Sequence, residues 1–211
     1  MKKSLNIIVS IVIMFFSINS LSAAEINKPF NRTGDFGVFL TGQFLGSDST
    51  DVDDDITYGV DAEIGIDDTD MYGIGFEYNI TQHLNININA LYGQTDGILK
   101  MNGYGYQYEG KSDVDIFAFN YNIDCNILKS RFTPVISVGI GFMTYNIDDV
   151  YGSGEDVDGT EFTYNIGAGF RWDVNDALFI KTIYKINWVE IDDTDSPLTM
   201  DGVQISVGFK F

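Results

Sequence analysis

The chain ends with the stretch Val203-Gln204-Ile205-Ser206-Val207-Gly208-Phe209-Lys210-Phe211, in which apolar residues alternate strictly with polar or small ones. Alternation with a period of two places one apolar row and one polar row on opposite faces of a β-strand. A long apolar strand at the edge of a sheet favours aggregation unless something closes over it. The stretch therefore predicts a terminal strand whose edge is covered by another part of the chain.

The same alternation recurs along the chain and predicts an all-β, antiparallel up-and-down fold. The eight expected strands lie near residues 35–46, 71–80, 84–94, 113–123, 131–145, 161–172, 177–189 and 201–211. Their connections alternate in length: short turns are expected at 81–83, from Asp124 to Ser130 and from Asp173 to Asp176, and longer acidic or glycine-rich loops elsewhere. Alternating short turns and long loops are typical of a transmembrane β-barrel. In the third strand Asn85, Asn87 and Asn89 share one face, which we expect to line a hydrated lumen.

An internal repeat supports the barrel. Residues 74–86 align without gaps on residues 168–180, and the core of the repeat, Phe-x-aromatic, recurs in two further strands. We predict an aromatic girdle at one membrane interface, made of Phe76, Tyr78, Phe119, Tyr121, Phe170, Trp172, Phe209 and Phe211.

Two further segments, 56–66 and 104–108, also alternate. If both crossed the membrane, the barrel would have ten strands. That arrangement would put the turn at 81–83 and its repeat counterpart at 173–176 on opposite sides of the membrane, so we interpret both segments as strand extensions standing above it.

The N-terminus resembles a secretory signal peptide over residues 1–24. It has a basic start at Lys2 and Lys3, an apolar run from Ile7 to Phe16 and small residues before the expected cut after Ala24. An uncleaved anchor helix is the alternative, but the apolar run is short for a membrane span. The remaining residues, 25–211, form the predicted barrel domain.

Composition excludes several other classes. Without Lys2 and Lys3 the chain carries 10 basic and 31 acidic residues, a net charge of −21, and a nucleic-acid-binding protein would need a basic face. The single cysteine, Cys125, cannot form an internal disulfide, and we expect it to be a free thiol without a role. Beyond the N-terminus no apolar run reaches the length of a transmembrane helix, so a membrane-embedded chain would have to be a closed barrel.

The whole predicted barrel, from Asp35 to Phe211, resembles the eight-stranded outer-membrane barrels of the opacity-protein, OmpA-type and OmpW-type ("porin family") group. The resemblance is carried by residues 132–142 (FTPVISVGIGF), residues 167–172 (GAGFRW) and the final Phe211. It implies a location in the outer membrane of a Gram-negative envelope, in contact with lipid and lipopolysaccharide. It also implies that the assembly machinery of that membrane reads the C-terminal signal Val203, Ile205, Val207, Phe209 and Phe211.

Charged residues fall on the row that we expect to face the barrel interior: Glu77, Arg171, Lys181, Lys185 and Lys210. Buried charges must be paired or hydrated, and eight strands leave an interior that side chains roughly fill. Two interpretations remain open, a structural network that plugs the barrel and a gate in a small pore.

The expected loops are rich in carboxylates. Solvated acidic loops are the simpler interpretation, because no stretch matches a full calcium loop; the alternative is weak cation binding at Asp51, Asp53, Asp54 and Asp55. His83, in a turn, is the only histidine, and no zinc cluster or phosphate-binding loop is present, so we expect neither catalysis nor a cofactor. We predict a structural or surface-interaction role, in which the loops contact host or environmental ligands. The alternative is a narrow channel for small or apolar solutes.

Overall fold

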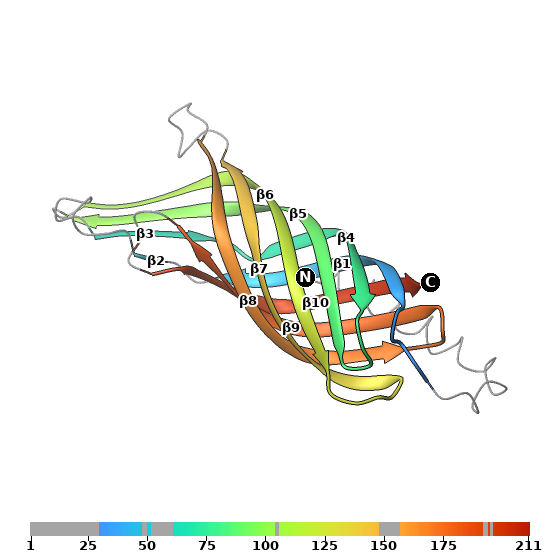
Figure 1. The fold of residues 1–211 in the computed structure, drawn as a ribbon. Helices are drawn as coiled ribbons and strands as arrows, with labels where there is room; N and C mark the ends of the chain where they lie inside the picture. Colours follow the sequence, from blue (N-terminus) through green and yellow to red (C-terminus); the bar gives the residue numbers. More distant parts are fainter. Residues whose placement is uncertain are drawn as a thin grey trace. The chain divides into compact units, whose positions relative to one another are not determined.

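Figure 1 shows the computed structural model, which describes residues 30–47, 50–51, 61–103, 106–147, 157–191, 194 and 196–211. The predicted signal peptide lies outside the described residues, as do Asp53, Asp54 and Asp55. Residues 31–211 form one compact unit.

The described strands form one antiparallel sheet. Their bounds are β1 (Phe36–Ser47), β2 (Thr50–Asp51), β3 (Asp61–Ile66), β4 (Thr69–Asn79), β5 (Leu84–Gly103), β6 (Tyr106–Asn126), β7 (Phe132–Ile147), β8 (Val157–Asp173), β9 (Leu178–Glu190) and β10 (Leu198–Lys210). Their order is β2-β3-β5-β4-β1-β10-β9-β8-β7-β6, and pairing of β5 with β6 closes β1 and β4 to β10 into a ring. The predicted up-and-down barrel of eight strands is confirmed.

The terminal strand closes the ring. β10 pairs with β1 from Gly37↔Lys210 to Ser47↔Met200 and with β9 on its other side. The residue after the strand is also held in place, since the Phe211 N–H donates to the Phe36 carbonyl at 2.8 Å. Both edges of the apolar C-terminal strand are therefore covered, as the sequence predicted.

The ends of the barrel differ. The short connections, at 80–83, 127–131 and 174–177, lie at the same end as the C-terminus, which we call the turn end; we call the opposite end the loop end (Figure 1). Two of the predicted turns begin too early: Asp124 is still inside β6 and Asp173 is the last residue of β8. In outer-membrane barrels the short turns face the periplasm.

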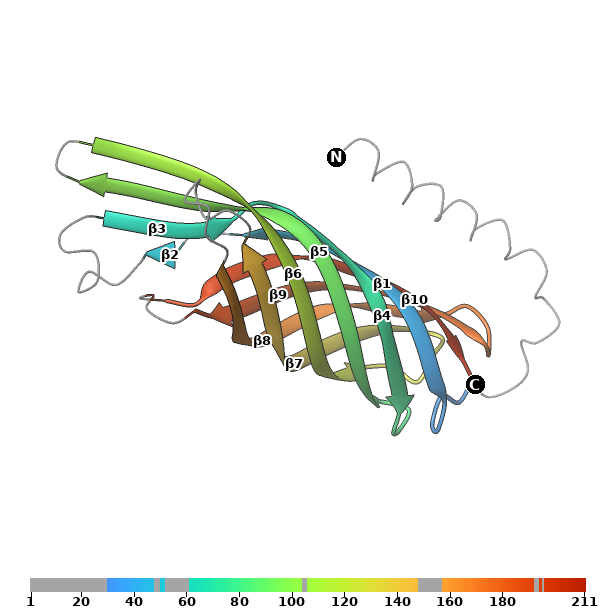
Figure 2. The same cartoon turned by 90° about the horizontal axis from the view of Figure 1, so that it is seen from above.

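At the loop end the β5–β6 hairpin continues past the ring (Figure 2). β3 pairs with its β5 strand from Asp61↔Asn102 to Ile66↔Gly97, and β2 pairs with β3. Because β2 and β3 extend the wall and do not cross it, the ten-stranded alternative is wrong. The part of the 56–66 segment before Asp61 lies outside the described residues.

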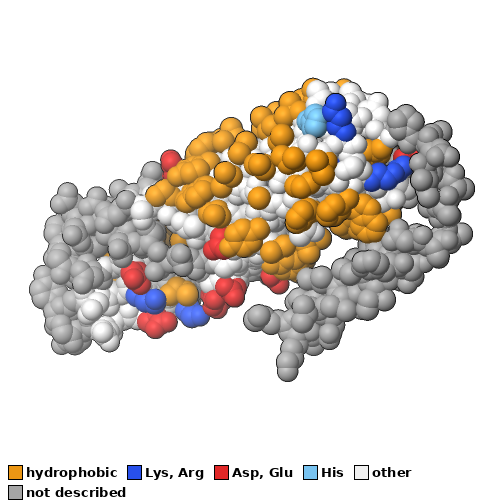
Figure 3. All heavy atoms as spheres, turned by 90° about the horizontal axis from the view of Figure 1, so that it is seen from below, with side chains coloured by type: hydrophobic (Ala, Val, Ile, Leu, Met, Phe, Trp, Pro, Cys, Tyr) orange, Lys and Arg blue, Asp and Glu red, His pale blue; other side chains and the backbone are white. Residues whose placement is uncertain are grey.

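The outer face of the ring is apolar. Exposed side chains such as Leu40, Ile74, Ile140 and Phe170 point outward, and hydrophobic side chains cover the barrel wall in Figure 3. Inward residues between them are buried, which gives β4 its alternating burial pattern. An outward apolar belt of this kind suits a wall that faces lipid. No helix in the described part of the chain is long and apolar enough to span a membrane.

Inward-facing glycines leave space for two phenylalanine side chains inside the barrel. A Cβ on Gly75 would lie 2.3 Å from Cζ of Phe39, and one on Gly208 would lie 2.5 Å from Cε1 of Phe179. Phe39 and Phe179 are fully buried, with ring centroids 6.2 Å apart. The interior is therefore filled by side chains, as expected for eight strands.

Candidate functional site: the barrel interior

An ionic network fills the turn-end half of the interior. Arg171 lies at its centre, with its Nη2 2.7 Å from Oε1 of Glu77 and 3.2 Å from Oδ1 of Asp173. Lys181 bridges Oδ2 of Asp124 at 2.6 Å and Oε2 of Glu77 at 3.7 Å. All five side chains are buried, so the network places opposite charges in contact away from bulk water.

Lys210 extends the network toward the C-terminus. Its Nζ lies 2.8 Å from Oδ1 of Asp173 and 3.5 Å from Oδ2 of Asp35. Asp173 thus joins Lys210 to Arg171, and the chain of contacts runs without a break from the start of β1 to β6.

Arg32, in the segment before β1, joins separate parts of the chain at the turn end. Its Nη1 donates to the Gln82 carbonyl at 3.0 Å, and its Nη2 donates to the Ser130 carbonyl at 2.6 Å and to Oδ2 of Asp173 at 3.1 Å. Two turns and the end of β8 are thereby joined by one fully buried guanidinium.

The two buried rings support the network. The guanidinium carbon of Arg171 lies 4.3 Å from the ring centroid of Phe179, and Nζ of Lys181 lies 5.5 Å from that of Phe39. Aromatic faces attract cations at such distances. The rings therefore add a favourable contact to each of the two cations.

Amide side chains occupy the middle of the interior. Asn87 donates to Oδ2 of Asp124 at 2.9 Å and accepts from Asn122 at 3.2 Å. Asn122 in turn accepts from Nζ of Lys185 at 3.0 Å. Asn89 accepts from Asn120 at 3.3 Å. The face of Asn85, Asn87 and Asn89 does line the interior, where all three are buried.

The loop-end half of the interior holds a cluster of apolar side chains, which the sequence did not predict. The cluster, which lies beside buried polar residues such as Gln43 and Thr163, is contributed by β1, β4 to β7, β9 and β10: Leu45, Met71, Leu91, Val114, Ile116, Ala118, Met143, Val189, Leu198 and Met200. The described interior therefore contains paired charges near the turns and packed hydrocarbon near the loops.

The structure brings the predicted interior residues together. Glu77, Arg171 and Lys181 are in direct contact, Lys210 joins them through Asp173, and Lys185 reaches Asn122. Four members of the network were not predicted: Arg32, Asp35, Asp124 and Asp173. Asp124 and Asp173 continue the inward rows of Asn120–Asn122 and Arg171, so the same alternation could have identified them.

The predicted girdle residues all lie on the outward face. On β4, β8 and β10 they lie among the strand residues nearest the turn end. On β6 the strand continues beyond Tyr121 to Asn126. Ile123 and the exposed Cys125 occupy the outward positions nearest the turn on β6. A girdle of these residues at one membrane interface stays a prediction. The C-terminal signal residues, from Val203 to Phe211, form the outward row of β10.

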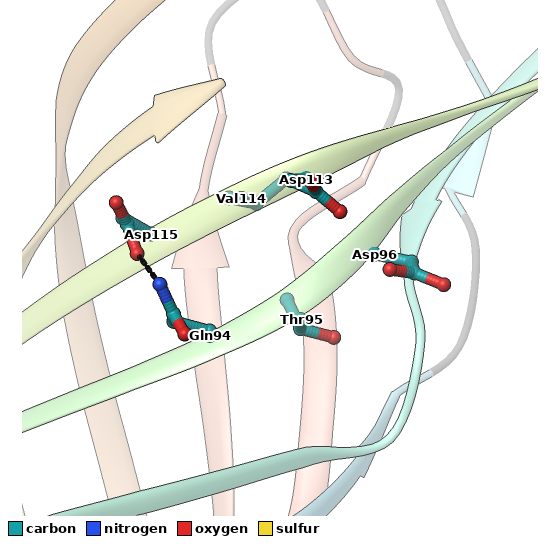
Figure 4. Close-up of a pocket in the computed structure, with 6 residues that line it drawn as sticks. All are labelled: Gln94, Thr95, Asp96, Asp113, Val114 and Asp115. Atoms are coloured by element: carbon teal, nitrogen blue, oxygen red, sulfur yellow. Dashed lines mark hydrogen bonds between the residues drawn. The ribbon is translucent and has the colours of Figure 1, made fainter. Parts of the chain in front are cut away.

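A hollow of about 320 Å³ lies where the β5–β6 hairpin leaves the barrel, lined by Gln94, Thr95, Asp96, Asp113, Val114 and Asp115 (Figure 4). Its Asp115 carboxylate accepts from Tyr92 at 2.7 Å and from Gln94 at 2.6 Å.

Among the described residues no group of carboxylates, histidine and cysteine could hold a metal ion. His83 stays in its turn, with Nδ1 2.7 Å from the Asn126 carbonyl.

A closed ring with an apolar outer wall and a filled, partly charged interior defines a transmembrane β-barrel. The family model described as "Outer membrane protein beta-barrel domain" matches residues 9–211. The chain belongs to this family, and it is a protein of the bacterial outer membrane.

Two solved structures show the same fold. OprG from Pseudomonas aeruginosa is 13% identical, and the match covers 88% of this chain and 99% of that chain with a TM-score of 0.60. Neisserial surface protein A (NspA) is 15% identical, with 84% of this chain and 99% of that chain covered and a TM-score of 0.56. A comparison with curated proteins found no match.

Proposed function

We propose that this protein is a closed outer-membrane barrel that acts through its outer surface, in a structural or surface-contact role. The observation that carries the proposal is the double seal of the interior. An ion would have to break the Glu77–Arg171 contact at 2.7 Å and then cross the apolar cluster around Met71. Each step is costly, because breaking a buried pair leaves an uncompensated charge and a hydrocarbon layer offers no hydration.

The loop end supports the surface role. The extension of β3, β5 and β6 carries several acidic side chains, among them Glu63, Asp67, Asp96 and Glu109, against two described lysines, Lys100 and Lys111. Lys111 lies 3.3 Å from Oδ2 of Asp67, and Lys100 lies 3.4 Å from Oε2 of Glu63. These exposed pairs leave an acidic excess at the surface that faces away from the turns.

Solute uptake by liposomes tests the closed interior against a narrow channel. Vesicles that contain the refolded protein should swell in a small sugar or a small apolar solute at the rate of protein-free vesicles. Swelling that rises with the amount of protein would make the narrow channel the better description. A general porin incorporated in parallel shows that the assay can report a pore.

We also infer that the outward row of β10 is the signal for the outer-membrane assembly machinery and that the apolar belt contacts lipid and lipopolysaccharide. Phe209 and Phe211 are exposed at the turn end, where the assembly machinery would bind the last strand. Deletion of Phe211 should reduce the amount of folded, heat-modifiable protein in the outer membrane, whereas Lys129→Ala, in an exposed turn, should not. Equal recovery of both variants would show that Phe211 is not part of the assembly signal.

A further inference from the structure

One cation of the barrel interior lacks a carboxylate partner. Lys185 is 3% exposed, and within the described part of the chain its Nζ has a single hydrogen-bond partner, Oδ1 of Asn122 at 3.0 Å. An ammonium carries three N–H donors, and a buried charge without an opposite charge in contact is strongly destabilising. Two donors and one positive charge of Lys185 therefore remain to be compensated.

The described carboxylates of the interior are bound by other groups. Asp124 attracts Lys185 from beyond ion-pair distance, but its Oδ2 is already in contact with Nζ of Lys181 at 2.6 Å. Glu161 is half-buried nearer the loop end, where it accepts from the Tyr145 hydroxyl at 3.3 Å. The charge of Lys185 is therefore not neutralised by a carboxylate of the described ranges.

Asn165, on β8, is the second unsatisfied group. Its side chain is 5% exposed, and neither Nδ2 nor Oδ1 has a hydrogen-bond partner among the described residues. Buried side-chain amides are nearly always hydrogen-bonded, and an unsatisfied one commonly marks the place of a bound water molecule or ion. The Asn165 amide therefore points to a ligand inside the barrel.

The two groups converge above a glycine. On the inward face, Gly139 of β7 lies between Asn122 of β6 and Asn165 of β8. A Cβ on Gly139 would meet Oδ1 of Asn122 and would lie 2.8 Å from Nδ2 of Asn165. Lys185 passes over Gly167, where a Cβ would lie 2.9 Å from its Cγ, and reaches the same Asn122 oxygen. The ammonium and the unpartnered amide thus lie beside the same side chain.

We propose that Lys185 and Asn165 hold a small monovalent anion of the halide class inside the barrel. The ammonium supplies an opposite charge and two N–H donors, and the amide nitrogen supplies two more. A water molecule alone would satisfy the amide but would leave the buried charge uncompensated. Beside the ion, a water molecule donates to Oδ1 of Asn165. The site is independent of the surface role proposed above.

Thermodynamic linkage tests the site with bromide as the probe. The full barrel is unfolded reversibly by urea in lipid vesicles while bromide replaces gluconate at constant ionic strength. Because the ion binds only the folded barrel, the equilibrium constant for unfolding should fall about tenfold for each tenfold rise in bromide above the dissociation constant. The ion enters as the chain folds, so the measurement does not require an open barrel.

Two substitutions should abolish this dependence for different reasons. Lys185→Met removes the charge, whereas Asn165→Asp supplies a carboxylate in place of the ion. The matched control is Lys100→Met, which removes an exposed lysine of the extension and should keep the dependence of the wild type. Heat-modifiability on gels establishes that each variant is folded. A wild type that ignores bromide, or the same dependence in Lys185→Met and Asn165→Asp as in the wild type, would overturn the proposal.

Diffraction at the bromine absorption edge locates the ion. Crystals of protein refolded in bromide should give an anomalous peak in contact with Nζ of Lys185 and Nδ2 of Asn165, and crystals of Lys185→Met should give none there. A water molecule without anomalous signal at this position would contradict the proposal. So would a peak that survives in Lys185→Met, because it would mark an adventitious ion only.

Discussion

The two halves of the barrel interior are held by different interactions. The turn-end half is held by ion pairs, in which each charge depends on a named partner, and its five cations and four carboxylates come from segments far apart in the chain. The loop-end half is held largely by packing, in which the effect of a substitution depends on the volume removed. Damage should therefore be abrupt in the first half and graded in the second.

The largest effect is expected in the ionic half. Arg171→Met leaves the buried carboxylates of Glu77 and Asp173 without their closest shared partner and should lower the free energy of unfolding by about 3–5 kcal/mol. Urea unfolding in lipid vesicles, followed by tryptophan fluorescence, measures this. The matched control, Lys100→Ala, removes an exposed pair and should cost at most about 1 kcal/mol. Equal losses in both variants would show that burial of the network does not matter.

The apolar half should respond according to the volume removed. Met71→Ala, at a side chain that is 2% exposed, should cost about 2–5 kcal/mol because it opens a cavity. Met71→Leu conserves most of the volume and should cost less than about 1.5 kcal/mol. The same urea titration separates the two. If Leu and Ala were equally destabilising, packing would not be what holds this half.

Overpacking at the boundary of the two halves should have a smaller effect than either of these changes. Gly75→Ala places a Cβ 2.3 Å from the Phe39 ring and 2.7 Å from the Ile88 carbonyl, so we expect a loss of about 1–3 kcal/mol. Gly46→Ala is the control, because its Cβ would meet its nearest atom, Oδ1 of Asp68, at an ordinary 3.5 Å. A harmless Gly75→Ala would mean that Phe39 is free to move.

The smallest effect concerns an exposed ion pair outside both halves. The Asp68 N–H, 2.9 Å from Oδ1 of Asp67, and then Lys111 hold the pKa of Asp67 below its ordinary value. Because this pKa is lowered in the folded state, the ionised Asp67 carboxylate stabilises the fold at pH values above the ordinary carboxyl pKa. This stabilisation is lost as the pH falls through the lowered pKa. Carboxyl NMR titration should show a higher midpoint in Lys111→Gln; an unchanged midpoint would exclude a role of Lys111.

The contrast between the halves also explains what could be predicted from the sequence. Alternation identified the ring, the closing strand and the inward row that contains Glu77 and Arg171. It could not identify the apolar half, because inward Leu45 and Leu91 look like outward residues when both faces of a strand are apolar. Arg32 belongs to no strand, and its role depends on turns that meet only in the folded barrel. The turn boundaries failed at Asp124 and Asp173, since aspartate commonly marks a turn and is rare inside a barrel wall.

The length of the β5–β6 hairpin was also underestimated. Residues 95–103 contain Asp96, Gly97 and Gly103, which weaken an isolated strand, so that the expected strand ended near 94. Pairing with β3 on one side and β6 on the other stabilises the extension nonetheless. Local sequence preference was overridden by partners distant in the chain.

Planar-bilayer conductance tests the double seal most directly, with four forms of the protein compared. Wild type, Glu77→Ala/Arg171→Ala and Met71→Ser/Leu91→Ser should all be silent, because each single lesion leaves one seal intact. The combination of the four substitutions should give discrete openings. Openings in the wild-type protein, or full conductance after loss of either half alone, would contradict the account of two seals in series.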